Sequence, residues 1–229
     1  MKKQRTIYQL IVDRSGSMSD CIENTVTGFN EQVSRIRQIE QKFPDQHIVM
    51  GLTSFNHEIE HHLKFVPIQS IPTLTAGIYK PDGNTALLDA IGLTTKLIES
   101  EVGLIENTDT TCVVVILTDG HENASKYFTL QSIRERIAQL EATGKWTFSF
   151  IGATLDAVNV AEKMNISASN SFSFDKKSMK QEVWDKLGDS MDSYMAKKVA
   201  GNGSLRSGVS FVIRLMRRSI YGYLLLLSR

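Results

Sequence analysis

The sequence predicts an α/β fold, in which strands and helices alternate along most of the chain. Short runs of apolar and β-branched residues indicate strands, and most of them are followed by a segment with apolar residues at helical spacing. The run at 111–118 is apolar throughout its centre, which is typical of a strand buried on both faces of a parallel sheet. These patterns together predict a three-layer, doubly wound sheet of six mostly parallel strands, with helices on both faces.

The first half of the chain contains three predicted strands and a long helix. The strand at 6–12 is followed by a helix at 22–39, whose apolar residues recur every three or four positions. Two further strands, at 47–55 and 58–66, are separated only by Asn56-His57, which favours a two-residue turn. This pair is therefore expected to be antiparallel, with its second strand at the sheet edge.

The second half of the chain alternates between strands and helices. Residues 67–84 contain three prolines and the turn sequence Asp-Gly-Asn, and they are expected to form a loop. The helix after the most apolar strand has Leu130, Ile133, Ile137 and Leu140 as its apolar stripe. The remaining segments are predicted as strands at 111–118, 146–151 and 171–174, and as helices at 85–103, 130–143, 155–164 and 179–194.

The length and composition fit one globular domain at 1–200, followed by a linker and an Arg-rich tail at 201–229. Hydrophobic residues make up 41% and charged residues 22% of the chain, as in ordinary soluble proteins. The formal net charge of +1 gives no reason to expect nucleic acid as a partner.

The amino-terminal composition and the cysteine usage favour a cytoplasmic protein. The first ten residues are charged and contain no apolar stretch long enough for a signal peptide. No run reaches the ~18 consecutive apolar residues that a membrane-spanning helix needs. Cys21 opens a predicted helix and Cys112 opens the most apolar strand, so both are expected to be buried free thiols.

Directly after the first predicted strand comes Asp13-Arg14-Ser15-Gly16-Ser17, which has an oxygen-bearing side chain at every second position. Side chains two residues apart in an extended segment point to the same side. The glycine between the two serines lets the backbone curl tightly there. One carboxylate and two hydroxyls are therefore expected to meet at one point, and such oxygen ligands suit a hard divalent cation.

Two further polar residues are expected beside this motif. Asp119 follows the most apolar strand, in Thr118-Asp119-Gly120, and Thr85 opens the helix after the loop at 67–84. In a doubly wound sheet, ligands bind beyond the carboxyl ends of the strands, near the point where the strand order reverses. If the strands that precede the two aspartates are neighbours, two carboxylates and three hydroxyls share one crevice.

The pattern resembles the von Willebrand factor type A domain, a family with a metal-ion-dependent adhesion site (MIDAS). That site combines Asp-x-Ser-x-Ser after the first strand with a Thr in a later loop and an Asp after the fourth strand. The order of elements agrees over about residues 5–200. The resemblance implies the strand order 3-2-1-4-5-6 with strand 3 antiparallel, and a bacterial intracellular member of the family with an intact site. The matching residues are Asp13, Ser15, Ser17, Thr85 and Asp119.

The resemblance also implies a chemistry for the site. Mg²⁺ or Mn²⁺ is the expected cofactor, because such ions prefer oxygen ligands, and Mg²⁺ retains several of its waters. Ser15, Ser17 and Thr85 would coordinate as neutral hydroxyls, while Asp13 and Asp119 would act through coordinating waters. One coordination position would remain open for an Asp or Glu of a partner protein. The expected function is therefore metal-dependent protein binding.

Two other function classes stay open at this point. A Mg²⁺-dependent hydrolase resembling the haloacid dehalogenase phosphatases would need a second Asp two residues after Asp13, where this chain has Ser15. The chain also lacks a Gly-rich phosphate loop, a Ser nucleophile elbow and a Cys–His arrangement, so we expect no enzyme activity. The third class is a metal-independent interaction module that binds through its closing helix or its tail.

Other polar residues are expected to serve the fold rather than a site. His57, His61 and His62 suggest zinc, but adjacent strand residues face opposite sides, which keeps the last two from sharing a metal. A polar edge strand explains them better, since polar residues discourage unwanted strand pairing. His121 and Glu122 are expected on the rim of the crevice as solvated loop residues.

The tail has a different composition from the rest of the chain. Residues 205–229 contain five Arg and neither Lys nor acidic residues, whereas residues 1–204 contain 15 Lys and six Arg. Three interpretations stay open. The tail is a basic amphipathic helix that contacts a membrane surface or a partner, a disordered extension, or a segment translated out of its ancestral reading frame.

Overall fold

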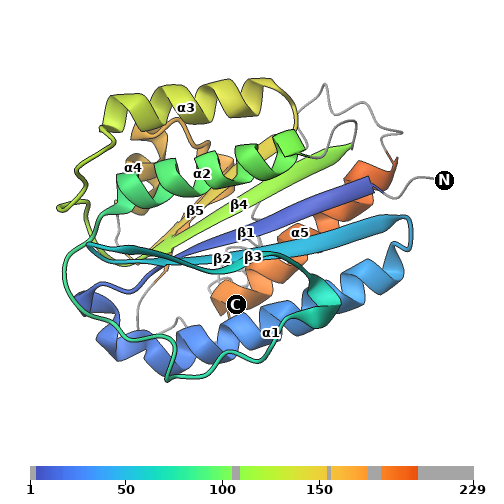
Figure 1. Ribbon diagram of the computed structural model, residues 1–229, viewed down its shortest axis with the longest axis horizontal. Coiled ribbons are helices and arrows are strands. Elements are labelled where there is room, and N and C mark those ends of the chain that lie inside the picture. The colour runs from blue at the N-terminus through green and yellow to red at the C-terminus, as the bar shows by residue number, and fades with distance from the viewer. Residues whose placement is uncertain (1–3, 105–108, 154–155, 175–181, 201–229) are drawn as a thin grey trace, which may run out of the picture.

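A six-stranded sheet forms the centre of the protein (Figure 1). The structure is a computed structural model that describes residues 4–104, 109–153, 156–174 and 182–200. The strands are β1 (Gln4–Asp13), β2 (Gln46–Phe55), β3 (Ile59–Pro67), β4 (Thr110–Thr118), β5 (Trp146–Gly152) and β6 (Ser171–Ser173). Their order is β3-β2-β1-β4-β5-β6, and among the described strands only β3 pairs antiparallel. The predicted strand order and directions are confirmed.

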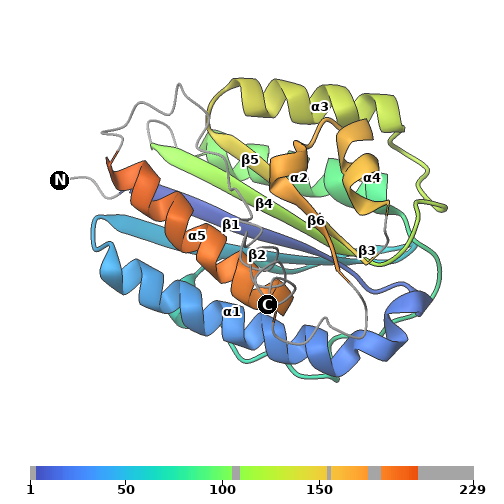
Figure 2. The same cartoon turned by 180° about the vertical axis from the view of Figure 1, so that it is seen from behind.

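Helices cover both faces of this sheet, as the alternating pattern predicts. The described helices are α1 (Ile22–Lys42), α2 (Leu87–Leu104), α3 (Leu130–Ala142), α4 (Ala157–Lys163) and α5 (Glu182–Ala200). α1 and α5 pack on one face, and α2, α3 and α4 pack on the other (Figure 1 and Figure 2). The described chain is therefore a three-layer α/β/α sandwich.

The strand side chains alternate between two separate hydrophobic cores. In β1, Tyr8, Leu10 and Val12 join the core under α1 and α5, whereas Ile7 and Ile11 join the core under α2, α3 and α4. All residues of β4 are buried, which matches its continuous apolar sequence. β1 and β4 are neighbours at the centre of the sheet, and because they are parallel, their carboxyl ends reach the same edge.

A glycine in α1 lets α5 approach closely. A Cβ at Gly28 would lie 1.8 Å from Nε1 of Trp184, so glycine is needed to leave room for that indole ring. Further along the two helices, Arg35 pairs with Asp189. α1 and α5 are therefore held against each other as well as against the sheet.

The loop between β2 and β3 differs in length from the prediction. It has three residues rather than two, because Phe55 pairs with Ile59 across the antiparallel strands. The N–H of Asn56 donates to the carbonyl of Glu58 at 3.0 Å inside this loop. Asn56, the first residue of this loop, also contacts the neighbouring loop through Asp82.

The helices begin and end slightly differently from the prediction. α2 starts at Leu87 instead of residue 85, and Gly103 lies inside its last turn rather than ending it. Leu130 is 42% exposed, because it is the first residue of α3 and precedes the part of the helix that packs on the sheet. The predicted positions 155 and 179, and the whole tail at 201–229, lie outside the described residues.

The cysteines and the helices agree with the expectations from composition. Cys21 and Cys112 are buried thiols that form no disulfide. Burial raises the pKa of the Cys112 thiol to about 12. Within the part of the chain that the structure describes, no helix has the length and apolarity to cross a membrane.

Lys198 of α5 is a buried base near the amino end of β1. It is 4% exposed, and its Nζ donates to Thr6 Oγ1 at 2.8 Å and to the carbonyl of Arg5 at 3.4 Å. Burial lowers the pKa of this amine from 10.5 to about 8, although the charge of Asp109 opposes the change. The charged form of Lys198 is therefore less stable in the folded chain than in the unfolded chain.

We predict that Lys198 makes stability depend on pH in alkaline solution. Between pH 8 and 10.5 the unfolded chain binds this proton more strongly, so the contribution of Lys198 to the free energy of unfolding increases as the pH rises through this range. This contribution changes by about 2 kcal/mol between about pH 7.5 and 10. Urea unfolding measures it as the difference in pH dependence between the unmodified protein and Lys198→Met, and the exposed control Lys197→Met should behave like the unmodified protein. Equal slopes in all three would contradict the prediction.

Candidate metal site

Asp13 is buried at the carboxyl end of β1, with 0% exposure. Its Oδ1 accepts the N–H of Ser15 at 2.7 Å, and its Oδ2 accepts the hydroxyl of Thr118 at 2.5 Å. Burial raises the pKa of this carboxyl, the two hydrogen bonds oppose the increase, and the charge of Asp119 adds to it. A buried carboxylate of this kind is stabilised when a positive charge binds beside it.

Hydroxyl groups connect the Asp13 loop to Asp119. Asp119 directly follows β4 and is 6% exposed. The hydroxyl of Ser17 donates to Asp119 Oδ1 at 2.6 Å, and the Oγ atoms of Ser15 and Ser17 lie 3.1 Å apart. Because β1 and β4 are parallel neighbours, the two aspartates leave the sheet close together.

Thr85 approaches the same region from a third loop. It is 3% exposed, and its N–H donates to Asn123 Oδ1 at 2.9 Å. A Cβ at Gly120 would lie 2.8 Å from Thr85 Oγ1 and 3.5 Å from Asp13 Oδ2. Glycine at this position therefore lets the backbone of the loop after β4 lie close to this hydroxyl and carboxylate, where a side chain would collide with Thr85.

Backbone hydrogen bonds hold the three loops together. The N–H of Gly16 donates to the carbonyl of Gly83 at 3.0 Å, and the N–H of Asp82 donates to the carbonyl of Arg14 at 2.9 Å. On the other side, the N–H of Asn123 donates to the carbonyl of Thr85 at 3.0 Å. The structure thereby brings together the five residues predicted from the sequence: Asp13, Ser15, Ser17, Thr85 and Asp119.

Asn56, which the sequence predicts only as a turn residue, organises these loops. It is 2% exposed, and its Nδ2 donates to the carbonyl of Asp82 at 2.8 Å. Its Oδ1 accepts the N–H of Glu58 at 2.8 Å, and its carbonyl accepts the N–H of Ala86 at 2.7 Å. Asn56 therefore joins the end of β2 to the loop that carries Thr85. Its preference for turns is the only sequence feature that pointed to it.

Two further residues that the sequence did not reveal hold Asp13 in place. Thr118 accepts the N–H of Gly120 at 3.1 Å while its hydroxyl donates to Asp13, so it contacts both sides of the site. The hydroxyl of Tyr79 donates to the carbonyl of Asp13, and burial raises the pKa of this phenol. Thr118 directly precedes the candidate residue Asp119, so its place in the sequence could have suggested a role in the site. No pattern in the sequence links Tyr79 to Asp13.

The set of donors fits a hard divalent cation. Two carboxylates and three hydroxyls offer oxygen ligands, which is the chemistry that Mg²⁺ and Mn²⁺ select. Arg14, the base inside the motif, is turned away and pairs with Glu60 at 2.7 Å and Glu58 at 3.9 Å. The described residues contain no metal-binding cluster of three or more His, Cys, Asp or Glu. A cation at this site would therefore depend on the hydroxyl groups.

Comparison with known families agrees with this geometry. The family model of the von Willebrand factor type A domain matches residues 9–122, a range that contains all five candidate residues. No curated protein matches the chain.

Solved structures share the fold at low sequence identity. A von Willebrand factor type A protein from Catenulispora acidiphila is 13% identical with a TM-score of 0.56, over 83% of this chain and 43% of that chain. BatB from Bacteroides thetaiotaomicron is 13% identical with a TM-score of 0.54, over 84% of this chain and 99% of that chain. Proximal thread matrix protein 1 from the mussel byssus, solved with a zinc-occupied MIDAS motif, is 15% identical with a TM-score of 0.53, over 83% of this chain and 46% of that chain.

Family and fold together support a von Willebrand factor type A domain. This chain spans less than half of the length of the Catenulispora and mussel proteins. At identities this low, the likeness to the solved structures concerns the fold alone.

Carboxylates that point inward hold the loop after β4. Glu122 accepts the N–H of Leu88 at 2.9 Å and the N–H of Ser125 at 2.8 Å, so it is not the solvated rim residue that the sequence predicted. Asp89 is 2% exposed and accepts the N–H groups of residues 126–128 at 2.7 to 2.9 Å. These bonds fix the loop against the start of α2.

The histidines of the edge strand do not form a metal site. His61 Nδ1 lies 2.9 Å from Thr53 Oγ1, and His62 Nε2 lies 2.6 Å from Ser54 Oγ, so each ring contacts a different hydroxyl of β2. Burial lowers the pKa of both imidazoles. These contacts agree with the interpretation of a polar edge strand. His121 is exposed on the loop after β4, as expected.

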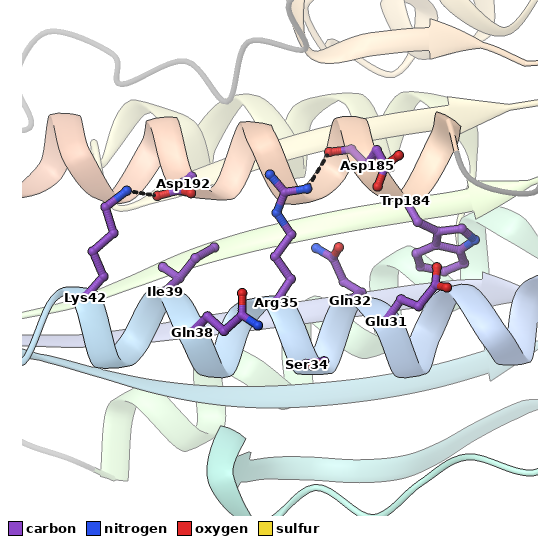
Figure 3. A pocket seen from close by; sticks show the side chains of 10 residues that line it. All are labelled: Glu31, Gln32, Ser34, Arg35, Gln38, Ile39, Lys42, Trp184, Asp185 and Asp192. Atoms are coloured by element: carbon purple, nitrogen blue, oxygen red, sulfur yellow. Dashed lines mark hydrogen bonds and ion pairs between the residues drawn. The ribbon is translucent and has the colours of Figure 1, made fainter.

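A groove of about 510 Å³ lies between α1 and α5 (Figure 3). Lys42 reaches across it to Asp192 at 2.7 Å, and Arg35 reaches the carbonyl of Asp185 at 3.4 Å (Figure 3). The groove follows the two helices and does not lie at the carboxyl ends of β1 and β4. Because its charged side chains bind one another, we interpret it as a contact between helices.

We predict that Asn56→Ala destabilises the site without changing its oxygen ligands. The substitution removes both side-chain hydrogen bonds of Asn56, to the backbone of residues 58 and 82, which costs about 1–3 kcal/mol of unfolding free energy. Urea unfolding measures this loss. The control is Asn84→Ala, at an exposed asparagine of the neighbouring loop, with an expected change below about 0.5 kcal/mol. Equal stability of the two variants would argue against this role for Asn56.

Proposed function

We propose that the chain is a metal-dependent protein-binding module. The observation that carries the proposal is the meeting of three loops, each with oxygen-bearing side chains, at the carboxyl ends of β1 and β4. The backbone at Gly120 lies close to Thr85 Oγ1 and Asp13 Oδ2, and Ser17 contacts Asp119. Oxygen donors gathered in this way favour the binding of a hard cation.

Each residue has a role in this proposal. Ser15, Ser17 and Thr85 would offer neutral hydroxyl oxygens to Mg²⁺ or Mn²⁺, and Asp13 and Asp119 would hold water molecules beside it. When bound, the cation would supply a Lewis-acid position for one Asp or Glu of a partner protein. Because the direct ligands from this chain would be neutral, the site would keep its attraction for a negatively charged side chain.

A structural neighbour extends the choice of metals to test. The mussel protein holds zinc in its MIDAS motif, so Zn²⁺ belongs in the comparison with Mg²⁺ and Mn²⁺. Carboxylate and water oxygens suit harder ions, whereas zinc more often selects nitrogen and sulfur ligands. We therefore propose Mg²⁺ or Mn²⁺ as the cofactor of this chain.

We also propose that the module is not an enzyme. Ser15 occupies the position where phosphatase-type hydrolases need a general acid, and its Oγ lies 3.1 Å from another serine hydroxyl. Incubation with p-nitrophenyl phosphate and Mg²⁺ tests this. Metal-dependent turnover that Asp13→Ala abolishes would overturn the proposal.

We propose a cytoplasmic location and a protein rather than a nucleic acid as partner. Both cysteines are thiols that form no disulfide, which is typical of proteins in reducing compartments. The net charge of +1 supplies no general attraction for a phosphate backbone.

Thermal unfolding tests the metal site. At about 100 times its dissociation constant, a bound cation adds about 2.7 kcal/mol of stability, which raises the melting temperature of a domain of this size by about 5–10 °C. We therefore expect millimolar Mg²⁺ or Mn²⁺ to raise the melting temperature of EDTA-treated protein. The increase should disappear in Asp119→Ala.

A pair of glycine variants sharpens this test. Gly120→Ala would bring a Cβ to 2.8 Å from Thr85 Oγ1 and force that hydroxyl to move, whereas a Cβ at Gly103 in α2 meets nothing within 4 Å. We expect Gly120→Ala to lose most of the metal-induced increase in melting temperature and Gly103→Ala to keep it. An equal increase in every variant, or none in the unmodified protein at millimolar metal, would contradict the proposed site.

A further inference from the structure

We propose that the partner's coordinating Asp or Glu lies in a basic segment, with Lys or Arg on either side of it in sequence. This inference rests on the proposed function, because it concerns the partner of the same site. It follows from the distribution of charge around the site, where exposed carboxylates gather on one side.

Two of these carboxylates lie beside the Asp13 motif, on β3 and the loop before it. The side chains of Glu58 and Glu60 are 69% and 51% exposed, and both face Arg14. The side chain of Arg14 is only 11% exposed and lies 2.7 Å from Glu60 and 3.9 Å from Glu58. One positive charge balances only one of the two carboxylates, so this part of the rim keeps a net negative charge.

Further exposed carboxylates lie in the segments that adjoin the Asp13 motif. Asp82 is exposed, and its N–H donates to the carbonyl of Arg14 within the motif. Asp20, in the short 3-10 helix at 16–21, and Glu23, in the first turn of α1, are both exposed. Lys80, which is exposed nearby in sequence, balances only one of these charges. We call the following residues the acidic rim: Asp20, Glu23, Glu58, Glu60 and Asp82.

The opposite side of the site has a different character. In the loop after β4, the carboxylate of Glu122 points inward and accepts backbone N–H groups. The carboxylate of Asp89, in α2, accepts backbone N–H groups of the same loop. The exposed side chains of this loop include His121, Lys126 and Tyr127, the last of which is 77% exposed. A partner segment that crosses the site therefore meets exposed carboxylates mainly on the side of the Asp13 motif.

Electrostatic repulsion and attraction would then select the partner. A carboxylate that approaches the cation passes the acidic rim, so further acidic residues beside it would be repelled. Lys or Arg beside it would instead form exposed ion pairs with the rim, each of them weak. Two or three such pairs amount to a preference of about tenfold, which salt should weaken.

A peptide selection tests this inference. A displayed peptide library with one fixed central Asp and random flanking residues is bound to the full chain in Mg²⁺, and the binders are eluted with EDTA. We expect Lys and Arg to be enriched about tenfold over Asp and Glu in the flanking positions, and the enrichment to fall at high salt.

Variants that remove charges of the acidic rim test whether the rim causes the enrichment of Lys and Arg. The double variant Glu58→Gln, Asp82→Asn removes two charges of the acidic rim and keeps the side-chain shapes. Asn can still accept the N–H of Gly83, which Asp82 Oδ1 accepts at 2.8 Å. This variant should lose most of the Lys and Arg enrichment. The control Glu135→Gln, at an exposed position of α3, should keep it.

The outcomes separate this inference from the proposed function. Binders eluted by EDTA that have neutral or acidic flanks would overturn the basic partner and still support metal-dependent binding. Equal enrichment with the double variant and the control would overturn the role of the acidic rim. If no binder depends on the metal, both proposals fail, and the metal-induced increase in melting temperature then shows independently whether the cation site exists.

Discussion

The parallel pairing of β1 with β4 is the constraint on which the rest of the site depends. It aligns Val12 with Leu117, so both strands end at the same edge of the sheet and Asp13 and Asp119 leave it close together. The two strands are buried in both cores, and a shift by one residue would turn each side chain toward the wrong core. Hydrophobic packing thus determines the position of the carboxylates, although neither carboxylate takes part in the packing.

The buried carboxylate of Asp13 is the chemical consequence of that pairing. Its pKa is raised because burial outweighs the hydrogen bonds from Thr118 and the backbone of Ser15. A positive charge would remove the disadvantage of burial, which gives the site a physical reason to bind a cation. Hydroxyl groups suit this situation because one oxygen both donates and accepts. The hydroxyl of Ser17 donates to Asp119 and retains lone pairs that a cation could use.

Acidic residues around the site form two groups, one that accepts backbone hydrogen bonds and one that is exposed to solvent. Asp89 and Glu122 point inward and accept backbone N–H groups, so they hold the loop after β4 in one conformation. Glu58 and Asp82 are exposed and place negative charge on the side of the site formed by the Asp13 motif. The first group makes the site rigid and the second would influence what can approach it. Their residue types are the same, and only their surroundings separate them.

The sequence by itself determined the order of the elements, the antiparallel edge strand and the five candidate side chains, because apolar periodicity and strand-end motifs are local patterns. The tertiary structure decided how those side chains are held. Asn56, Thr118 and Tyr79 bind loops that are distant in sequence, so no local pattern could reveal their partners. It also decided that Glu122 points inward, since its acceptor role depends on the position of α2. Hydrogen bonds between loops join atoms that are far apart in sequence, and only the folded chain establishes which of these atoms meet.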